Sequence, residues 1–410
     1  MRGAVVAVGT ELLLGDVVNT NAAWLGNRLR AAGVQVVTST AVADDLDRLA
    51  ATIRLCLADA DVVVLCGGLG PTVDDLTRDA LALACDAPLR RDDRLVEHLR
   101  GLFAGPVPVD VYRQADVPAG AEPLANPAGS APGLWLEQDG KVVVALPGPP
   151  RELQPTSEPV WPRLAARSGR VLTTRQVLVA GLGESSVAER LHELRVPAGV
   201  DLSYLASTGL VRVRFTSADA ALVPPLVEQV AASLGDHVYG YDDQTLDGVV
   251  HDLLAGREQT VAVAESLTGG LLAAALSTRS GSSATFRGGV VVYATDLKET
   301  LAGVPGPLLE AEGAVAASTA AALAAGTRDR LGADWGVATT GVAGPTEQEG
   351  KPVGTVYVAV AGPHREEAGH TGHVRRLDLR GDRDRIRQAT VVAALDLLRR
   401  TLLGRADGSG

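Results

Sequence analysis

The sequence predicts an α/β protein of two or three domains, and three observations support this prediction. Short valine-rich apolar segments alternate with segments of helical period, the pattern of a parallel sheet covered by helices on both faces. The chain has 410 residues, which is too long for one ordinary domain. Because 46% of the residues are hydrophobic and only 3% are aromatic, Ala, Val and Leu must fill the cores.

The first part of the chain shows this alternation most clearly. Residues 3–8 have the apolar character of a buried strand, residues 34–40 predict the next strand, and residues 21–32 between them have the period of an amphipathic helix. Residues 46–58 predict a second helix, and residues 61–66 predict a third strand. The carboxyl ends of parallel strands meet at one edge of the sheet, where open α/β folds bind ligands.

A glycine-rich loop, residues 67–72, follows the third strand and leads to Asp74, Asp75 and Thr77. Glycines at this position let the backbone approach a phosphate closely. The paired aspartates have the chemistry to hold a hard cation such as Mg²⁺. Alternatively, they open the following helix, whose dipole favours acidic residues in the first turn. The local sequence leaves both interpretations open.

The pattern changes between residues 167 and 243. Residues 175–180 and 210–216 alternate like strands with one exposed face, and residues 185–194 and 222–234 predict short helices. We therefore expect a β-α-β-α unit of about half the usual domain size.

The last part of the chain is organised around residues 260–298. An apolar strand, residues 261–264, passes through Glu265 and Ser266 into a helix over residues 271–276. The first backbone N–H groups of a helix have no intrahelical partners, so they can hold a hydroxyl, a phosphate or a developing oxyanion. Ser266 is therefore a candidate nucleophile, with an ordinary helix N-cap as the alternative.

Two further groups follow within this stretch. The loop that contains Ser283 leads into a predicted strand, residues 290–293, which delivers Tyr293 and, five residues later, Lys298. Two serines, a tyrosine and a lysine are the parts of a nucleophilic site that needs no histidine. No histidine has motif support; the seven occur at positions 98, 192, 237, 251, 364, 370 and 373.

Lys298 is informative because lysine is rare in this chain. Lysine occurs only at positions 141, 298 and 351, so 35 of the 38 basic residues are arginine. Arginine cannot give up its proton in a protein, whereas burial can lower the pKa of a lysine until it acts as a general base. A surface lysine just after a strand is the alternative interpretation of Lys298.

The remaining elements complete an α/β domain. Helices are predicted at residues 318–331 and 384–403, and strands at residues 335–339 and 355–361. The loop after the first of these strands, residues 341–345, should line a pocket. Arg383 opens the last helix, where its planar fork of donors could contact a phosphate, although a solvated arginine is common at a helix start.

Composition excludes several classes of protein. The net charge of −11 and a pI near 5.2 argue against a broad nucleic-acid-binding face. Cys56, Cys66 and Cys85 lack CxxC spacing, so we interpret them as reduced core residues. The sequence shows no signal peptide and no apolar run of about 18 residues that could span a bilayer, so we expect a cytoplasmic protein without a membrane partner.

Six blocks of the last 150 residues resemble, in the right order, the nicotinamide-nucleotide amidase domain of the CinA family. The blocks are residues 264–270 (AESLTGG), 281–283 (GSS), 288–293 (GGVVVY) through Lys298, 313–315 (GAV), 340–345 (TGVAGP) and 351–356 (KPVGTV). The resemblance implies hydrolysis of the carboxamide of nicotinamide mononucleotide to nicotinate mononucleotide and ammonia, without a cofactor. Two departures are Leu267, where the family usually has cysteine, and residues 294–296 (ATD), which replace Ser-Asn-Glu.

The resemblance also implies roles for individual residues. Ser266 would be the nucleophile, and Ser283, Tyr293 and Lys298 would be its activating network. The implied substrate-binding residues are Thr268, Gly269, Gly270, Gly341, Ala343, Gly344 and Arg383.

Three N-terminal blocks resemble the first domain of the same family, which has a molybdopterin-binding-like three-layer α/β fold. These are residues 8–15 (VGTELLLG) with 19–21 (NTN), residues 67–77, and residues 146–152 (LPGPPRE); residues 126–133 also match and should form the loop opposite Gly68. The resemblance implies a pyrophosphatase that acts on ADP-ribose with a divalent metal such as Mg²⁺. The implied nucleotide-site residues are Glu11, Asn19, Gly68, Gly70, Thr72 and Thr77, with Asp74 and Asp75 on the metal.

The expected organisation is a molybdopterin-binding-like domain (1–166), a KH-like α+β module (167–243), an amidase domain (244–405) and a disordered tail (406–410), assembled as a homodimer. The KH-like module lacks a basic, aromatic strand face, so we interpret it as a spacer or dimer contact without direct nucleic-acid binding. The alternative function is a non-catalytic nucleotide-binding or regulatory protein in DNA uptake, as the family's association with competence suggests. A binding protein has no need of a lysine at a motif position, which favours the enzyme.

Overall fold

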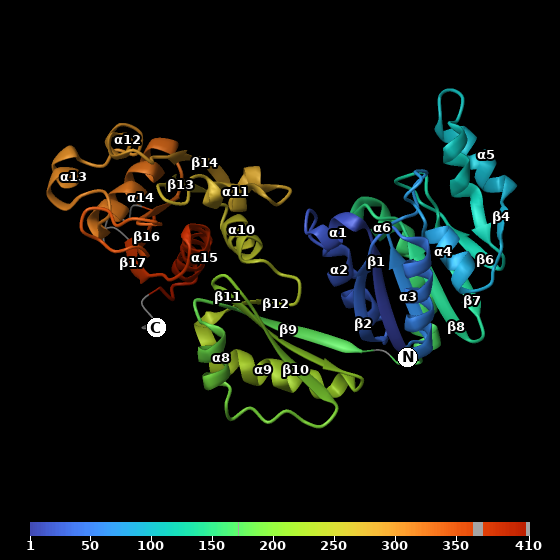
Figure 1. The fold of residues 1–410 in the computed structure, drawn as a ribbon. Helices are drawn as coiled ribbons and strands as arrows, with labels where there is room; N and C mark the ends of the chain where they lie inside the picture. Colours follow the sequence, from blue (N-terminus) through green and yellow to red (C-terminus); the bar gives the residue numbers. More distant parts are fainter. Residues whose placement is uncertain (171, 364–371, 407–410) are drawn as a thin grey trace. The chain divides into compact units, whose positions relative to one another are not determined.

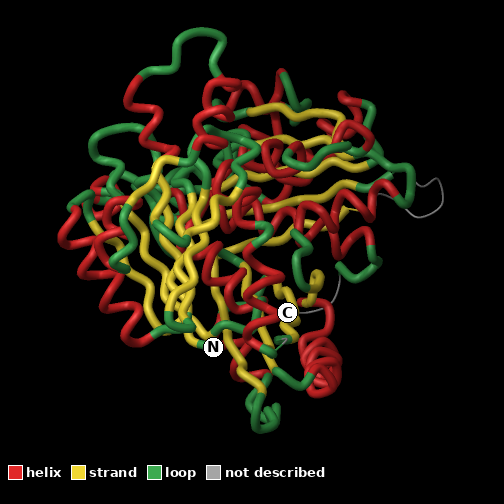
Figure 2. Tube along the Cα trace, turned by 90° about the vertical axis from the view of Figure 1, so that its right-hand side faces the viewer, coloured by secondary structure: helices red, strands yellow, loops and turns green. Residues whose placement is uncertain are grey.

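The structure is a computed structural model that describes residues 1–170, 172–363 and 372–406 (Figure 1). The chain divides into two compact units, residues 1–173 and 174–410. His364, His370 and the tail residues 407–410 lie outside the described residues. In both units strands lie side by side in sheets with helices against them (Figure 2).

The first unit contains a mixed six-stranded sheet in the order β2-β1-β3-β8-β7-β6. Strands β2, β1, β3 and β8 are parallel, and β7 and β6 continue the sheet antiparallel. A separate ribbon pairs β4 with β5. The strands are β1 (Arg2–Val8), β2 (Gln35–Val42), β3 (Val62–Cys66), β4 (Leu89–Arg91), β5 (Asp116–Pro118), β6 (Ala121–Leu124), β7 (Gly133–Gln138) and β8 (Lys141–Leu146); the helices are α1 (Thr10–Leu14), α2 (Thr20–Ala31), α3 (Leu46–Asp59), α4 (Thr77–Ala84), α5 (Asp93–Leu102), the 3-10 helix η1 (Val109–Ala115), α6 (Pro150–Ser157) and α7 (Val160–Ser168).

Helices cover both faces of this sheet, which confirms the three-layer prediction. Strand β3 is buried along its whole length. Its alternate residues enter different cores: Val63 and Leu65 pack with α3 and α4, and Val62 and Val64 pack with α2 and α7. Cys56, Cys66 and Cys85 are free and buried, as expected.

The second unit begins with a four-stranded sheet in the order β10-β11-β9-β12. Its elements are β9 (Thr173–Ala180), α8 (Glu184–Arg190), β10 (Val200–Ser207), β11 (Leu210–Ser217), the 3-10 helix η2 (Ala220–Leu222), α9 (Val223–Leu234), the 3-10 helix η3 (Gly235–His237) and β12 (Val238–Tyr241). All four predicted elements are present, but the predicted β-α-β-α unit was incomplete, because it omitted β10 and β12. Strand β12 is only four residues long, and β10 carries polar residues on a half-exposed face.

A second, five-stranded sheet has the order β14-β13-β15-β16-β17. Strands β14, β13 and β15 are parallel, and β16 and β17 are antiparallel to their neighbours. The elements are α10 (Leu246–Ala255), β13 (Val261–Glu265), α11 (Leu271–Ser277), the 3-10 helix η4 (Ser282–Ala284), β14 (Phe286–Val291), α12 (Thr295–Thr300), α13 (Gly306–Glu312), α14 (Ala317–Leu331), β15 (Trp335–Gly341), β16 (Thr355–Ala361), β17 (Gly372–Asp378) and α15 (Arg383–Leu402).

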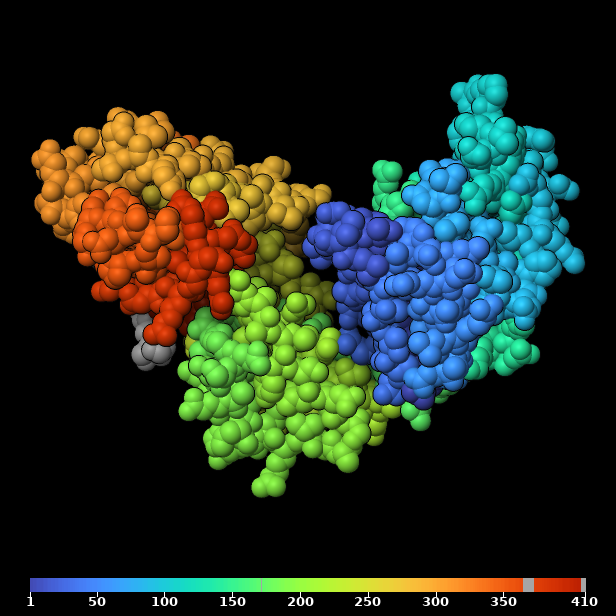
Figure 3. Space-filling model, in the orientation of Figure 1, coloured from blue at the N-terminus to red at the C-terminus, as the bar shows by residue number. Residues whose placement is uncertain are grey.

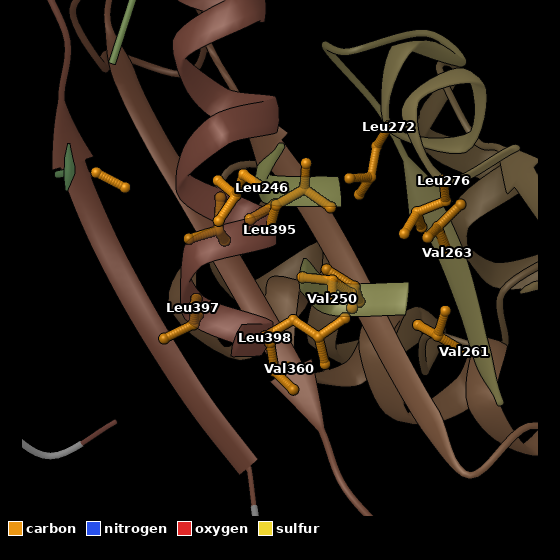
Figure 4. Packing of buried hydrophobic residues seen from close by; sticks show 14 of the residues in the cluster. Leu246, Val250, Val261, Val263, Leu272, Leu276, Val360, Leu395, Leu397 and Leu398 are labelled. Atoms are coloured by element: carbon orange, nitrogen blue, oxygen red, sulfur yellow. The ribbon is translucent and has the colours of Figure 1, made fainter. Parts of the chain in front are cut away.

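Two cores hold this sheet in place. On one face α10, α11 and α15 pack leucines and valines against β13 and β16, as Figure 4 shows for Leu246, Leu395, Val263 and Val360. On the other face α14 packs alanines and Leu323 against the sheet. Small residues let α14 approach closely: a Cβ on Gly336 of β15 would lie 1.9 Å from the carbonyl oxygen of Ala324.

The four-stranded sheet also joins the large core of the second unit. Val177 and Val179 of β9 pack with α8 and α9, whereas Leu178 and Ala180 belong to the same core as α10 and α15. The face of β9 that the sequence predicted to be exposed is therefore buried.

Charged groups also stabilise the contact between the four-stranded sheet and α15, where the green and red surfaces meet in Figure 3. Arg399 donates to the carbonyls of Asp236 (2.5 Å) and Val238 (3.2 Å). Arg399 and Arg400 both bind the buried carboxylate of Asp396, at 2.7 and 2.9 Å. Each of these charges has an opposite partner, which a buried charge requires.

Candidate active site

A cavity of about 290 Å³ opens beyond the carboxyl ends of β13 and β15. These parallel strands end at the same edge of the sheet, so the loops that follow them converge there. The cavity is lined by Ser266, Leu267, Tyr293, Lys298, Ala314, Val315, Thr340, Gly341, Val342, Ala343, Gly344, Thr346, Glu347, Gln348 and Arg383.

Ser266 is the first residue after β13. Its backbone N–H donates to the carbonyl of Thr339 at 3.0 Å, which extends the pairing of β13 with β15 by one residue. The side chain is 8% exposed. Its Oγ lies 3.4 Å from Nζ of Lys298, so the structure brings these two predicted residues together.

Lys298 lies on α12 and is only 1% exposed. Nζ donates to the carbonyl oxygens of Val292 (2.8 Å) and Tyr293 (3.3 Å), and its third contact is the Ser266 hydroxyl. In the neutral amine two N–H groups can remain on the two carbonyls, and the lone pair is then left for the hydroxyl proton. This is the arrangement that a general base needs.

Burial lowers the pKa of Lys298, and the carboxylates of Glu349 and Asp296 oppose this effect without reversing it. The direction agrees with the expectation for a lysine base. Asp296 lies on the same helix as Lys298, whereas Glu349 comes from a loop that is distant in sequence.

The helix α11 does not leave its N-terminal N–H groups free. The carboxylate of Glu265, itself 1% exposed, accepts hydrogen bonds from the backbone of Gly270 (2.9 Å), Leu272 (3.0 Å) and Ala273 (2.7 Å). A negative charge at this position also complements the helix dipole. The proposed use of these N–H groups for a hydroxyl or an oxyanion was therefore wrong.

Tyr293 follows the end of β14, which stops at Val291 rather than running to residue 293. Its hydroxyl accepts a hydrogen bond from Nη2 of Arg383 at 2.6 Å, while its backbone carbonyl contacts Lys298. Nη1 of Arg383 donates to the carbonyl of Gly344 at 2.5 Å. Tyr293 and Arg383 thus form one edge of the cavity, and the hydroxyl of Tyr293 is bonded to Arg383 rather than to Lys298.

The other predicted residues divide into two groups. Gly341, Ala343 and Gly344 line the cavity. Thr268, Gly269 and Gly270 form the turn behind Ser266, where Oγ1 of Thr268 lies 2.7 Å from Oγ1 of Thr339 and both glycines have positive φ. Ser283 is exposed on η4 and is not among the described residues that line the cavity.

The first unit has its own cavity, of about 400 Å³. Gly68, Gly70 and Asp75 line it together with residues 128–131, which confirms that the segment around Gly129 lies opposite the glycine-rich loop. Glu11, Asn19, Thr72, Asp74 and Thr77 are not among its described lining residues. Asn19 instead caps α2 by accepting from the Ala22 N–H, and Thr77 donates to the carbonyl of Gly67.

The two aspartates predicted to bind a metal differ in their surroundings. Oδ2 of Asp75 accepts from the backbone N–H and the hydroxyl of Thr72, at 2.8 and 2.6 Å, so it stabilises the glycine-rich loop. Asp74 is exposed. No group of three or more potential metal ligands occurs among the described residues.

Sequence reasoning missed several residues that build these sites. Glu265 looked like part of the motif around Ser266, and nothing in its position indicated a helix cap. Residues 313–315 had been matched to the family without a role, yet Ala314 and Val315 line the cavity. Gln114 lines the cavity of the first unit, is 1% exposed and has no partner for Oε1 among the described residues; no sequence signal pointed to it.

No helix within the described ranges combines the length and the apolar character needed to cross a bilayer.

Together these features define a multidomain α/β protein whose candidate sites are the cavity beside Ser266 in the second unit and the cavity beside the glycine-rich loop in the first. Residues 4–166 match the family described as Probable molybdopterin binding domain, residues 174–240 the Damage-inducible protein CinA KH domain, and residues 243–402 the CinA C-terminal domain. A CinA-like protein of Frankia casuarinae is 49% identical and covers 98% of this chain and 97% of its own length. The chain belongs to the CinA family.

A second relative agrees with this assignment. A CinA-like protein of a Synechococcus strain is 40% identical over 98% of both chains. A crystal structure of CinA from Thermoplasma acidophilum, described as a protein of unknown function, is 36% identical and covers 40% of this chain and 99% of its own, with a TM-score of 0.39.

Proposed function

We propose that the C-terminal domain hydrolyses the carboxamide of nicotinamide mononucleotide to nicotinate mononucleotide and ammonia. The observation that supports this proposal is the contact between Ser266 and a buried Lys298 whose other donors are engaged by two carbonyls. A structural lysine gains nothing from such burial, because removing its charge from water is costly. A lysine that works as a neutral base does gain from it.

The reaction divides into two steps at these residues. Ser266 Oγ attacks the carboxamide carbon while Lys298 takes the hydroxyl proton, and the pyridinium charge of the substrate polarises the carbonyl. When the tetrahedral adduct collapses, Lys298 returns the proton to the departing amide nitrogen, so ammonia leaves and an ester on Ser266 remains. Lys298 then takes a proton from the water that attacks the ester and returns it to Ser266 Oγ as the acyl C–O bond breaks; the acid product loses its remaining proton to solvent as the carboxylate.

The substrate phosphate has a natural partner in Arg383. Its guanidinium lines the cavity and is exposed, and it is already held by Tyr293 and Gly344. Arginine offers a planar pair of donors to phosphate oxygens. Tyr293 therefore serves to orient Arg383 in this proposal, whereas the family resemblance implied that it belongs to the network that activates Ser266.

Incubation of the purified protein with nicotinamide mononucleotide tests this function directly. We expect stoichiometric formation of ammonia and nicotinate mononucleotide, measured by coupled assay and mass spectrometry, with Ser266→Ala as the control for a contaminating activity. Binding of the nucleotide without turnover would instead support the alternative of a non-catalytic binding protein.

The pH profile gives a second test. A base must be deprotonated in the free enzyme, so kcat/KM should rise with pH through the pKa of Lys298 and then reach a plateau. Because burial lowers that pKa, the acid limb should lie below the ordinary lysine value of about 10.4. Chelators should have no effect on ammonia release. An acid limb near 6.5 that persisted in Lys298→Ala would point to a histidine and contradict the assignment.

For the first unit we propose a metal-dependent pyrophosphatase that acts on ADP-ribose. Its support is the glycine-rich loop after β3, with Gly68, Gly70 and Asp75 lining one cavity. Backbone N–H groups of such loops bind phosphates, and carboxylates beside them can share a Mg²⁺ ion with the substrate.

The two activities should be separable by mutation. A double variant, Asp74→Asn with Asp75→Asn, should lose Mg²⁺-dependent cleavage of ADP-ribose, because neutral amides hold Mg²⁺ poorly. The same variant should keep wild-type ammonia release, since the Ser266 cavity is formed entirely within the second unit. Parallel assays on one preparation provide the check, and a joint loss of both activities would contradict the division of function.

A further inference from the structure

The turn that follows β13, residues 266–270, carries the candidate nucleophile Ser266 and leads into α11. Two of its N–H groups are bonded close by in the sequence. Gly269 donates to the carbonyl of Ser266 at 3.2 Å, and Gly270 donates to the carboxylate of Glu265 at 2.9 Å. The N–H side of the turn is thus held by groups of the same segment.

The carbonyl side of the turn is held by one arginine, Arg387 of α15. Its Nε donates to the carbonyl of Leu267 and its Nη2 to that of Thr268, both at 3.0 Å. The Thr268 carbonyl accepts from the N–H of Leu271 as well, at 3.2 Å. One edge of the planar guanidinium therefore spans two consecutive carbonyl oxygens, and hydrogen bonds from a charged donor are about twice as strong as those between neutral groups.

The other contacts of Arg387 are weaker than its bonds to the turn. Its side chain is 27% exposed, and its ion-pair partner Asp384 lies 4.0 Å away with a side chain that is 70% exposed. An exposed pair at this separation contributes little, because water screens the two charges. The guanidinium therefore acts mainly on the turn after Ser266.

Arg387 is close to the site without reaching the cavity. It lies one helical turn after Arg383, which lines the cavity, but it is not among the described residues of the lining. Its connection to the cavity is Leu267, which lines the cavity, is 3% exposed and follows Ser266 directly in the chain. On the other side, the N–H of Ser266 is bonded to the carbonyl of Thr339. The backbone at the nucleophile is thus fixed from two directions.

We propose that Arg387 is a positioning residue of the Ser266–Lys298 site: its guanidinium fastens the turn after Ser266 to α15 and so keeps Ser266 Oγ in place for attack. The proposal rests on the proposed function, because it concerns the attack by Ser266. No bond is made or broken at Arg387. A displacement of about 1 Å near the reacting atoms can lower a rate about 100-fold, so the loss of this contact should be measurable.

The first test removes both bonds to the turn with Arg387→Ala. We expect kcat for ammonia release to fall roughly 10- to 100-fold while KM changes less than about 3-fold, because the residues that line the cavity are unchanged. Arg385→Ala is the matched control, since Arg385 is an exposed arginine on the same helix and lies outside the described lining of the cavity. Equal kinetic constants for the two variants would overturn the proposal.

Arg387→Lys separates the charge from the geometry. Lysine keeps the positive charge and most of the apolar stem, so thermal unfolding should stay close to that of the wild type. A single ammonium group cannot reproduce the planar pair of donors, so kcat should still fall while KM is little changed. A lysine variant with the kcat of the wild type would contradict the proposal, because the charge alone would then be sufficient.

Added guanidinium ion tests the geometry directly. In Arg387→Ala, guanidinium chloride at millimolar concentrations, far below those that unfold proteins, should restore kcat with saturation. Sodium chloride at the same ionic strength should have no such effect. A loss of activity caused only by a weakened helix would not respond to the ion, so a variant with normal thermal unfolding and no recovery of kcat would count against the role of Arg387.

A reaction that does not involve the nucleotide separates this proposal from the proposed function. With diisopropyl fluorophosphate, Ser266 Oγ bonds to phosphorus, fluoride leaves and Lys298 takes the hydroxyl proton; peptide mass spectrometry measures the rate. Labelling of Ser266 should be at least about 10-fold slower in Arg387→Ala than in Arg385→Ala. That difference in a protein that releases no ammonia would refute the amidase alone, and equal labelling rates in proteins that release ammonia would refute the role of Arg387 alone.

Discussion

Replacement of Ser266 by alanine should lower kcat for ammonia release from nicotinamide mononucleotide by at least about three orders of magnitude. Loss of a covalent nucleophile normally has this effect, because the remaining groups can only bind and polarise the substrate. The fold should be nearly unaffected. The backbone N–H of Ser266 still donates to Thr339, and Lys298 keeps both carbonyl partners, so we expect a cost in unfolding free energy of about 1 kcal/mol.

Steady-state kinetics, thermal unfolding and nucleotide binding should be measured on the same samples. Ser277→Ala is a suitable control, because Ser277 is an exposed serine at the end of α11 whose hydroxyl donates to Ala274 within the helix. A Ser266→Ala enzyme that kept more than about a tenth of the activity would exclude a nucleophile at this position. If Ser283→Ala were then the inactive variant, the role would pass to Ser283.

The fold could be predicted where strands and helices are regular and buried. Strand β3 is an uninterrupted apolar run, and it was predicted to within one residue because burial on both faces leaves little choice of residue. Strands β10 and β12 were missed for the opposite reason. A half-exposed strand with serines and an aspartate, and a strand of four residues, carry too little apolar pattern to stand out from a loop.

The candidate active site could also be predicted only in part. The position of Ser266 at a strand end and of Lys298 after the next strand followed from the order of elements, and the parallel pairing of β13 with β14 and β15 brings them together. The hydrogen-bond partners of the side chains could not be predicted from the order of the elements. Glu265 was not recognised as the cap of α11, and the hydroxyl of Tyr293 binds Arg383, which lies 90 residues away in sequence.

Sequence spacing also says little about loops that meet from distant parts of the chain. Glu349 accepts hydrogen bonds from the backbone N–H groups of residues 314 and 315, about 35 residues earlier. Its left-handed backbone and its contacts are visible only in three dimensions. The sequence could therefore not indicate that the carboxylate of Glu349 opposes the effect of burial on the pKa of Lys298.

Lys298→Arg should reduce kcat/KM for the amidase by about three orders of magnitude or more. Arginine keeps the positive charge but cannot act as a base at any pH that the protein tolerates. The larger guanidinium must also enter a site that is 1% exposed, so an overpacking cost of about 1–3 kcal/mol is expected. Thermal unfolding and kinetics on the same sample separate these effects, and Lys141→Arg, in the first unit, is the control for lysine replacement elsewhere.

Lys298→Ala extends this test by removing the steric problem. If the lysine acts as a base, the truncated site should accept a small primary amine in its place, and added methylamine should restore part of the turnover in proportion to the concentration of its neutral form. The recovered rate should therefore increase with pH toward the pKa of the added amine. A lysine that only binds or orients the substrate would give a different result: Lys298→Arg would retain near-normal turnover, and the rate of Lys298→Ala would not depend on the basicity of the added amine.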